Sequence, residues 1–495
     1  MAELVDRLER ALNPRTVAVV GDKGPGYMWL RNYRDFTGKL YSVQIDPTQI
    51  PGIEAMGVPN YTSLLDIPDE IDYVLLNVPR RAAPRVIADA AAKKVGVAAL
   101  FTSGFAETDE EEGIQLQDEL TRIARENDLL LIGPNCMGLY SPAVGIRQSG
   151  DQPTGKTGPT GIISQSGTHA IGLASLGAAN GVYVSRSVSM GNAIILDAAD
   201  YLEYFTRDPD TRVIAMYIEG VKRGHRFFEA LRRATAVKPV VIWKGGQTKA
   251  GQRATHSHTA SLATPSLIWD TMVRQCGATP ADSVDETIDA CKAFIYPKPG
   301  TGRRMALMAM TGGQSVVITD AFAKAGLEVP TLTDASYAQL AEFFNIIGGS
   351  YRNPFDMAGT IGRGGEQDNL RRLLDIVEAD PNIDAVAVES RMMMGGGRIP
   401  QGGPRAAGGP GAPGGVGGMG GFDPSNRMIT ALKEFQERSS KPLVAIVHPG
   451  ADEGGSAAAR KAAVEAGIAT FHSFERAARA YAKAAAYWRF RADLD

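Results

Sequence analysis

The sequence is poor in cysteine and contains no long apolar run. Its three cysteines, Cys136, Cys276 and Cys291, are too few and too scattered for a disulfide framework or a zinc site, and they fit a reducing cytosol. No apolar run reaches the roughly 18 residues that a helix needs to span a bilayer. The first residues mix acids with apolar side chains, unlike a signal peptide. We therefore expect a cytoplasmic protein without a membrane segment or a bound metal.

Neither sign of charge dominates the composition. The chain has 52 Lys and Arg residues against 55 Asp and Glu residues, for a formal net charge of −3. This balance gives no indication of a nucleic-acid partner or of an anionic membrane surface. With 495 residues and a hydrophobic content of 44%, the chain is long and apolar enough for three domains with packed cores.

Short apolar runs that end in Gly, Pro, Ser or Asn alternate with helical patterns along the whole chain. Such alternation predicts parallel sheets, and ligands of open parallel sheets bind outside the carboxyl ends of the strands. We therefore predict an α/β fold with three doubly wound parallel-sheet domains of the Rossmann or flavodoxin type. The expected domains are residues 1–150, 151–300 and 301–495.

The strand ends of the first domain carry the residue types of a nucleotide site. The run TVAVV at residues 16–20 leads into Gly21, Lys23, Gly24 and Gly26, and a helix-like segment follows at 27–36. Glycines there would let a phosphate approach the backbone at a helix N-terminus, although a simple tight turn explains them nearly as well. The remaining strand ends of this domain contribute Asp46, Pro47, Val78, Pro79, Thr102, Ser103, Gly104, Asn135 and Cys136.

The second domain repeats the pattern of strand, small polar turn and helix. Its turn consists of Ser164, Gln165, Ser166, Gly167 and Thr168. The N–H groups, hydroxyls and helix dipole of such a turn suit an anion, and a plain helix cap is the alternative interpretation.

Another strand of this domain ends at Glu219, and a third delivers the loop KGGQTKAGQRATHSHTASLAT at residues 244–264. The loop holds His256 and His258 among small residues, and an imidazole can accept a phosphoryl group as a covalent nucleophile. A solvated surface loop is the alternative. Because parallel strands end at one edge of a sheet, we expect the Ser164 turn, Glu219 and His258 to converge. A carboxylate beside a histidine orients the ring and raises its basicity.

The third domain lacks a clear catalytic cluster. A glycine-rich insertion at residues 395–421 interrupts it. Because this composition cannot bury a core, we expect a mobile surface loop there, with a partner contact or an active-site lid as the alternative.

Several motifs together resemble one enzyme family. LNPRTVAVVG, TSGFAE, GPNCMG, IISQSG, SMGN, YIEG and SHTASL occur in that family's order, and GLEVPTL and NPFD follow. Over nearly its whole length the chain resembles the α subunit of the NDP-forming acyl-CoA synthetases, of the acetyl-CoA synthetase (ADP-forming) type, in the succinyl-CoA synthetase superfamily. The resemblance implies conversion of an acid, CoA and a nucleoside triphosphate into acyl-CoA, the diphosphate and phosphate. It also implies an acyl phosphate and a phosphohistidine on a mobile loop.

The resemblance assigns roles to residues of this sequence. By motif position the phosphoryl carrier is His258, not His256. Glu219 would orient the phosphohistidine, and the turn from Ser164 to Thr168 would cradle its phosphate. CoA would lie over the first domain on the strand ends named above, with Asn135 and Cys136 near its thiol.

The chain also departs from the family pattern. SHTASLAT stands where SHTGSLAG is usual, so Ala260 and Thr264 replace glycines. The turn IDPTQ lacks the lysine that often follows its proline, which removes an expected phosphate contact to CoA. In the third domain, GGxG becomes Gly312-Gly313-Gln314-Ser315.

The sequence shows no ATP-grasp region. We therefore expect a separate ATP-grasp β subunit that binds ATP or ADP and Mg²⁺, in a heterotetramer that acts on a small carboxylic acid. One alternative is a non-catalytic regulatory relative that binds CoA or acyl-CoA, and a binder would need neither His258 nor Glu219. A nicotinamide dehydrogenase is disfavoured by the glycine spacing and by Asp46-Pro47, where a proline follows the ribose acid.

Overall fold

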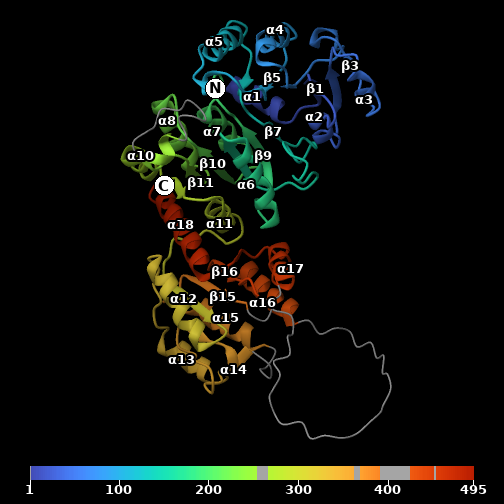
Figure 1. The fold of residues 1–495 in the computed structure, drawn as a ribbon. Helices are drawn as coiled ribbons and strands as arrows, with labels where there is room; N and C mark the ends of the chain where they lie inside the picture. The colour runs from blue at the N-terminus through green and yellow to red at the C-terminus, as the bar shows by residue number, and fades with distance from the viewer. Residues whose placement is uncertain (1, 254–265, 362–367, 391–423, 451–452, 495) are drawn as a thin grey trace, which may run out of the picture. The chain divides into compact units, whose positions relative to one another are not determined.

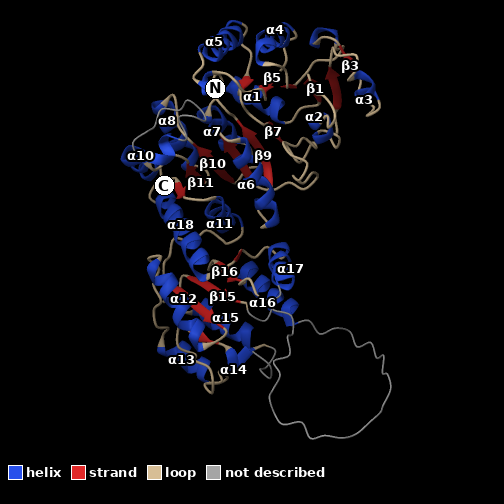
Figure 2. Ribbon diagram, viewed as in Figure 1, coloured by secondary structure: helices blue, strands red, loops and turns tan. Residues whose placement is uncertain are grey.

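A computed structural model describes residues 2–253, 266–361, 368–390, 424–450 and 453–494 (Figure 1). His258 and the insertion at 395–421 lie outside these described residues. The chain divides into two compact units, one of residues 1–295 with 486–495 and one of residues 296–485. Helices flank three mostly parallel sheets (Figure 2), which confirms the predicted α/β fold. None of the described segments forms an ATP-grasp fold.

The first sheet has the strand order β3-β2-β1-β4-β5-β6, and all its pairs are parallel. Its strands are β1 (Thr16–Val20), β2 (Lys39–Val43), β3 (Asn60–Tyr61), β4 (Tyr73–Leu76), β5 (Val97–Leu100) and β6 (Leu131–Ile132). Its helices are α1 (Ala2–Leu12), α2 (Met28–Asn32), α3 (Ile50–Glu54), η1 (Leu64–Asp66), η2 (Arg80–Ala82), α4 (Ala83–Ala92), η3 (Ala106–Thr108) and α5 (Glu111–Glu126). The strand order reverses between β1 and β4, where ligands of open α/β sheets bind.

The second sheet belongs to the same unit and has the order β12-β11-β10-β8-β9-β7. Its strands are β7 (Gly138–Tyr140), β8 (Thr160–Ser164), β9 (Val184–Ser189), β10 (Val213–Ile218), β11 (Val240–Lys244) and β12 (Thr279–Ala281). Its helices are α6 (Gly167–Ala179), α7 (Ala198–Arg207), α8 (Gly224–Thr235), α10 (Ser266–Gln275) and α11 (Val284–Ile295). The edge strand β7 pairs antiparallel with β9. We expected a purely parallel sheet here, and this strand makes the sheet mixed. An antiparallel edge strand is common on doubly wound sheets.

The second unit contains the third sheet, whose order is β14-β13-β15-β16-β17 with parallel pairs throughout. Its strands are β13 (Met305–Ala309), β14 (Phe355–Asp356), β15 (Ala385–Glu389), β16 (Leu443–Ile446) and β17 (Thr470–Phe471). The helices are α12 (Gly312–Lys324), α13 (Asp334–Ala341), α14 (Ala358–Ile361), α15 (Asn369–Ala379), α16 (Pro424–Arg438), α17 (Glu453–Glu465) and α18 (Phe474–Ala492). The last residues of α18 belong to the first unit.

Central strands such as β1 and β10 are buried at every position. Because helices cover both faces of a doubly wound sheet, such strands read as continuous apolar runs instead of alternating ones. The first two sheets share one apolar cluster, which includes Val17 of β1, Ile163 of β8 and Ile214 of β10. No helix in the described part of the chain has the length and apolar character that a membrane span requires.

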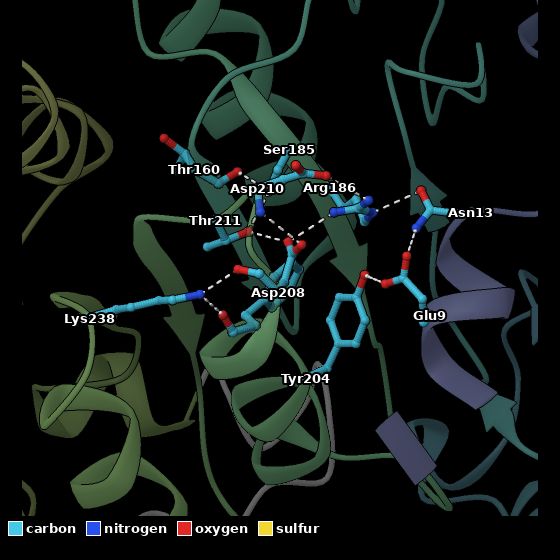
Figure 3. A network of polar contacts seen from close by, with 11 residues as sticks. Glu9, Asn13, Thr160, Ser185, Arg186, Tyr204, Asp208, Asp210, Thr211 and Lys238 are labelled. Atoms are coloured by element: carbon cyan, nitrogen blue, oxygen red, sulfur yellow. Dashed lines mark hydrogen bonds and ion pairs between the residues drawn. The ribbon is translucent and has the colours of Figure 1, made fainter. Parts of the chain in front are cut away.

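A partly buried polar network connects α1 to the second sheet (Figure 3). The Arg186 guanidinium of β9 donates to Asp208 Oδ2 at 2.9 Å, to Asp210 Oδ2 at 3.1 Å and to Asn13 Oδ1 at 3.0 Å, just after α1. The Tyr204 hydroxyl of α7 donates to Glu9 Oε2 of α1 at 2.6 Å. The network therefore joins α1 to strand β9 and helix α7 of the second sheet.

Candidate functional site

A cavity of about 760 Å³ lies at the carboxyl edge of the first sheet. This volume is within the usual range of cofactor and ligand pockets. Its walls come from the segments that follow β1, β2, β3, β4, β5 and β6, so the cavity extends along the sheet edge. The predicted residues that line it are Gly21, Lys23, Asp46, Val78, Pro79, Thr102, Ser103 and Asn135.

The turn after β1 is shaped by a glycine and a glutamine. Gly21 has φ +78°, and a Cβ there would lie 2.6 Å from the Asn77 carbonyl oxygen, so a side chain does not fit. The Gly24 N–H donates to Gln49 Oε1 at 2.7 Å. Gly24 and Gly26 are not among the described lining residues, although both were predicted site residues. Because its N–H already donates to the Gln49 side chain, Gly24 does not offer that donor to a ligand in this structure.

The turn after β2 is held by Gln44, which sequence reasoning missed. Its Nε2 donates to the Asp22 carbonyl at 2.9 Å, and its Oε1 accepts from the N–H groups of Ile45 and Asp46 at 2.9 and 3.0 Å. Hydrogen bonds from the backbone N–H and hydroxyl of Thr48 lower the pKa of Asp46, so this carboxylate stays ionised at the cavity wall. Pro47 is not among the described lining residues.

The ends of β5 and β6 form the far wall of the cavity. The Thr102 hydroxyl donates to the Val78 carbonyl at 2.6 Å, and the Asn135 N–H donates to the Thr102 carbonyl at 3.0 Å. Gly104 and Cys136 do not belong to the described lining. Cys136 is buried, its thiol donates to the Leu100 carbonyl at 3.4 Å, and burial raises its pKa to about 12. A thiol in that state packs in the core instead of contacting a ligand.

Asn192, in the SMGN motif, connects this wall to the second sheet. Its side-chain amide donates to Glu107 Oε2 at 2.6 Å and to Gln117 Oε1 at 3.0 Å. Its carbonyl accepts from Lys222 Nζ at 2.7 Å. Glu107 in turn accepts from the Gly104 N–H at 2.6 Å through its other oxygen. The motifs TSGFAE and SMGN are thus joined by hydrogen bonds, and Lys222, two residues after YIEG, is bonded to SMGN.

The predicted phosphate turn begins at the end of β8. The Ser164 hydroxyl donates to the Ser166 carbonyl at 2.7 Å, and Ser166 Oγ accepts from the His169 N–H at 3.4 Å as the N-cap of α6. Gly167 opens α6, and Thr168 is exposed in its first turn. The plain cap and the anion cradle use the same atoms, so both interpretations fit this geometry.

Glu219, at the end of β10, lies directly beside that turn. Gln165 Oε1 accepts from the N–H groups of Glu219 and Gly220, the latter at 2.9 Å. The Tyr217 hydroxyl donates to Glu219 Oε1 at 3.2 Å, and burial together with the Glu219 carboxylate raises the pKa of Tyr217, which keeps this donor protonated. Glu219 is 5% exposed. The structure thus brings the predicted turn and the predicted carboxylate together.

Lys244 and Gly245 connect Glu219 to the start of the histidine loop. Lys244 Nζ donates to the Glu219 carbonyl at 2.7 Å, and burial lowers the pKa of this ammonium while Glu219 opposes the shift. A Cβ on Gly245 would lie 2.6 Å from the Tyr217 hydroxyl, so a side chain at position 245 would collide with the Tyr217–Glu219 pair. His258 lies beyond Gly245, outside the described residues.

An aromatic cluster stands next to Glu219, and sequence reasoning missed it. The ring centroids of His169 and Tyr217 are 4.1 Å apart, and those of His169 and Trp243 are 4.5 Å apart. The three rings come from α6, β10 and β11, so no local motif could have indicated them. They form an aromatic cluster beside the carboxylate.

The third sheet carries a smaller polar group at its carboxyl edge. His448 Nε2 lies 3.7 Å from Glu389 Oε1, and Glu389 accepts from the Met310 N–H at 2.9 Å. Across the described part of the chain, no three His, Cys, Asp or Glu side chains are grouped as metal ligands would be.

Two family models match the chain. A model described as "CoA binding domain" matches residues 15–142, and one described as "Succinyl-CoA ligase like flavodoxin domain" matches residues 157–294. The two matches cover the first and second sheets.

Curated relatives are named ADP-forming acetate–CoA ligases or their alpha subunits. The acetate–CoA ligase [ADP-forming] II subunit alpha of Pyrococcus furiosus is 32% identical over 76% of this chain and 81% of its own length. The subunit alpha of ligase I of that organism is 34% identical over 77% of this chain and 82% of its own length. Acetate–CoA ligase [ADP-forming] I of Archaeoglobus fulgidus is 31% identical over 77% of this chain, but the match spans only 54% of that relative.

A solved structure resembles the whole chain. The dinucleotide-forming acetyl-coenzyme A synthetase 1 of Ca. Korarchaeum cryptofilum, in complex with phosphate and ADP, is 28% identical with a TM-score of 0.81, over 98% of this chain and 97% of that one. These similarities, the cavity on the first sheet and the Glu219 cluster on the second all indicate the same protein family. The chain belongs to the family of the ADP-forming acyl-CoA synthetases, among relatives of their α subunits.

Proposed function

We propose that this chain is the α subunit of an acid–CoA ligase that works through a phosphohistidine at His258. In the direction of synthesis, the phosphoryl group of phospho-His258 passes to an oxygen of the carboxylic acid and leaves a neutral imidazole. The CoA sulfur then attacks the carbonyl carbon of the acyl phosphate to form the thioester, the bond from that carbon to the phosphate oxygen breaks, and the thiol proton leaves with the phosphate. Splitting the reaction in this way replaces one difficult step by two easier ones.

The carrying observation is the contact between Glu219, the Ser164 turn and the base of the histidine loop. Glu219 is a buried carboxylate whose backbone is fixed by Gln165 and Lys244. A fixed carboxylate can hold the distal N–H of an imidazole, which leaves the other ring nitrogen free for the phosphoryl group. The N-terminus of α6 and the Ser166 hydroxyl supply donors for phosphate oxygens.

The cavity on the first sheet is the proposed CoA site. We assign to it the lining residues Gly21, Lys23, Asp46, Thr102 and Asn135. Residues 1–150 would then be the CoA-binding domain, with ligase domains at 151–300 and 301–495. The CoA thiol would then lie near Asn192, whose hydrogen bonds to Glu107 and Lys222 connect the first two domains.

A separate ATP-grasp β subunit would supply ATP or ADP and Mg²⁺, in a heterotetramer in the cytoplasm. Two relatives from Pyrococcus furiosus are named as alpha subunits, which supports a partner of this kind. Acetate is the first acid to test, because those relatives are named acetate–CoA ligases.

The test is formation of acyl-CoA from acetate, CoA and Mg²⁺-ATP by the chain with an ATP-grasp subunit. We expect His258→Asn to lower the rate by roughly a thousandfold or more, since the covalent carrier is lost. His256→Asn is the matched control from the same loop and should retain most of the rate. Equal activity of both variants, or turnover by the isolated chain, would contradict the proposal. CoA binding without any turnover would favour the regulatory relative instead.

A further inference from the structure

The CoA cavity contains a cation that no motif indicated. Among the described residues that line it, Lys23 and Arg85 are the only cations. Lys23 follows β1, whereas Arg85 lies in α4, which follows β4, so the two side chains come from different walls. CoA carries two separate anionic groups, the pyrophosphate and the 3′-phosphate of its ribose.

Among the described residues Arg85 forms no ion pair, whereas its neighbours Arg80 and Arg81 do. Arg80 donates to Glu110 at 2.7 Å and to Glu112 at 2.8 Å, and Arg81 is likewise paired with Glu112. Arg85 is exposed, and within the described residues neither it nor Lys23 forms an ion pair. An arginine that lines a ligand cavity without a carboxylate partner keeps its planar set of donors available for an anion.

The position of Arg85 indicates which phosphate it would meet. α4 contacts η1, the segment that follows the edge strand β3, and Lys93 just after α4 donates to the Ile67 carbonyl. Thr62, Ser63 and Leu64 line the cavity beside α4. In sheets of this order the diphosphate lies at the turn after β1, and the ribose lies next to it near the end of β2. Arg85 is therefore at the adenosine end of the cavity and Lys23 at the diphosphate end.

Two other observations favour a cation at the adenosine end. The turn IDPTQ after β2 lacks the lysine that would approach a phosphate there. The acids at this end, Asp46 and Asp89, would repel a phosphate and so increase the need for a positive group.

We propose that Arg85 binds the 3′-phosphate of CoA and makes this site select CoA over dephospho-CoA. This inference rests on the proposed CoA site and adds to it a specificity-determining residue. The interaction is a pair of charge-assisted hydrogen bonds from the guanidinium to the phosphate oxygens. A lysine at the same position would supply charge without the two-pronged geometry.

The test is calorimetric titration of the full-length chain with CoA and with dephospho-CoA. We expect the wild type to bind CoA about tenfold to a hundredfold more tightly, the range of charge-assisted hydrogen bonds at a partly exposed site. Arg85→Ala should weaken CoA binding by the same factor, leave dephospho-CoA unchanged and abolish the preference. Arg85→Lys should retain part of it.

Arg81→Ala is the matched control, because this arginine lies one turn earlier, is paired with Glu112 and is not among the described lining residues. It should preserve both affinities. If the wild type prefers CoA and Arg85→Ala keeps that preference, the role of Arg85 is refuted while the CoA site stands. If the wild type binds neither compound, the CoA site itself is wrong, and the inference fails with it.

Discussion

Replacing Arg186 by methionine should destabilise the first unit without changing its CoA cavity. The Arg186 guanidinium and the Asp208 carboxylate are almost completely buried, with side-chain exposures of 7% and 1%. The substitution removes three hydrogen bonds, to Asn13, Asp208 and Asp210, and leaves the Asp208 carboxylate buried without its cation (Figure 3).

The magnitude follows from what remains around Asp208. Breaking a buried ion pair costs about 3–5 kcal/mol, mostly because the surviving charge is uncompensated. Asp208 would still accept from the Thr211 hydroxyl at 2.6 Å and from the Asp210 N–H at 3.2 Å, which favours the lower end of that range. At about 2 °C per kcal/mol for a unit of this size, we expect the melting temperature to fall by roughly 6 °C.

The assay is thermal unfolding followed by circular dichroism, with CoA affinity measured on the folded variant. Arg81→Met is the control, because its pair with Glu112 is exposed and should change stability by less than about 1 kcal/mol. CoA affinity should be unchanged in Arg186→Met, since every described residue of the cavity lies between Val20 and Asn135. A melting temperature within 1 °C of the wild type, on the order of the expected error, would refute the reasoning.

Three further predictions concern the site. Gly245→Ala should lower the rate of acyl-CoA formation at least tenfold, on the order of a 1.4 kcal/mol loss. The new Cβ would lie 2.6 Å from the Tyr217 hydroxyl and would push that hydroxyl aside, which a steady-state assay would detect. Gly21→Ala should weaken CoA binding measured by titration, because the residue has φ +78° and its Cβ would meet the Asn77 carbonyl. Cys136 should not react with a thiol reagent at pH 8 until the protein is unfolded, because burial raises its pKa to about 12.

The regular elements were predictable because their signal is local. Strand β1, Thr16–Val20, matches the apolar run TVAVV from which it was expected, because a buried run of β-branched residues sets its boundaries. The helix expected at 27–36 is shorter, Met28–Asn32, because Tyr27 takes a left-handed conformation and a turn follows. The antiparallel strand β7 was not foreseen, since three residues carry no periodicity.

The site was predictable only where residues follow strands. The Ser164 turn and Glu219 meet because adjacent parallel strands end at one edge, which the sequence pattern already implied. Side-chain direction could not be read: Cys136 follows a strand as a ligand would, yet it points into the core. Gln49 lies in the turn before α3 and Arg85 lies in α4, and no spacing rule connects these two lining residues.

The most direct test of the phosphohistidine account is phosphoryl labelling. The chain, its ATP-grasp partner, labelled ATP and Mg²⁺ would be mixed without acid or CoA, and protein-bound phosphate would be tested for lability in acid and stability in base. The account predicts such label on the wild type and on His256→Asn, none on His258→Asn, and a faster loss of label from Glu219→Gln. A wild-type complex that binds CoA but takes no label, or a label that survives in His258→Asn, would contradict it.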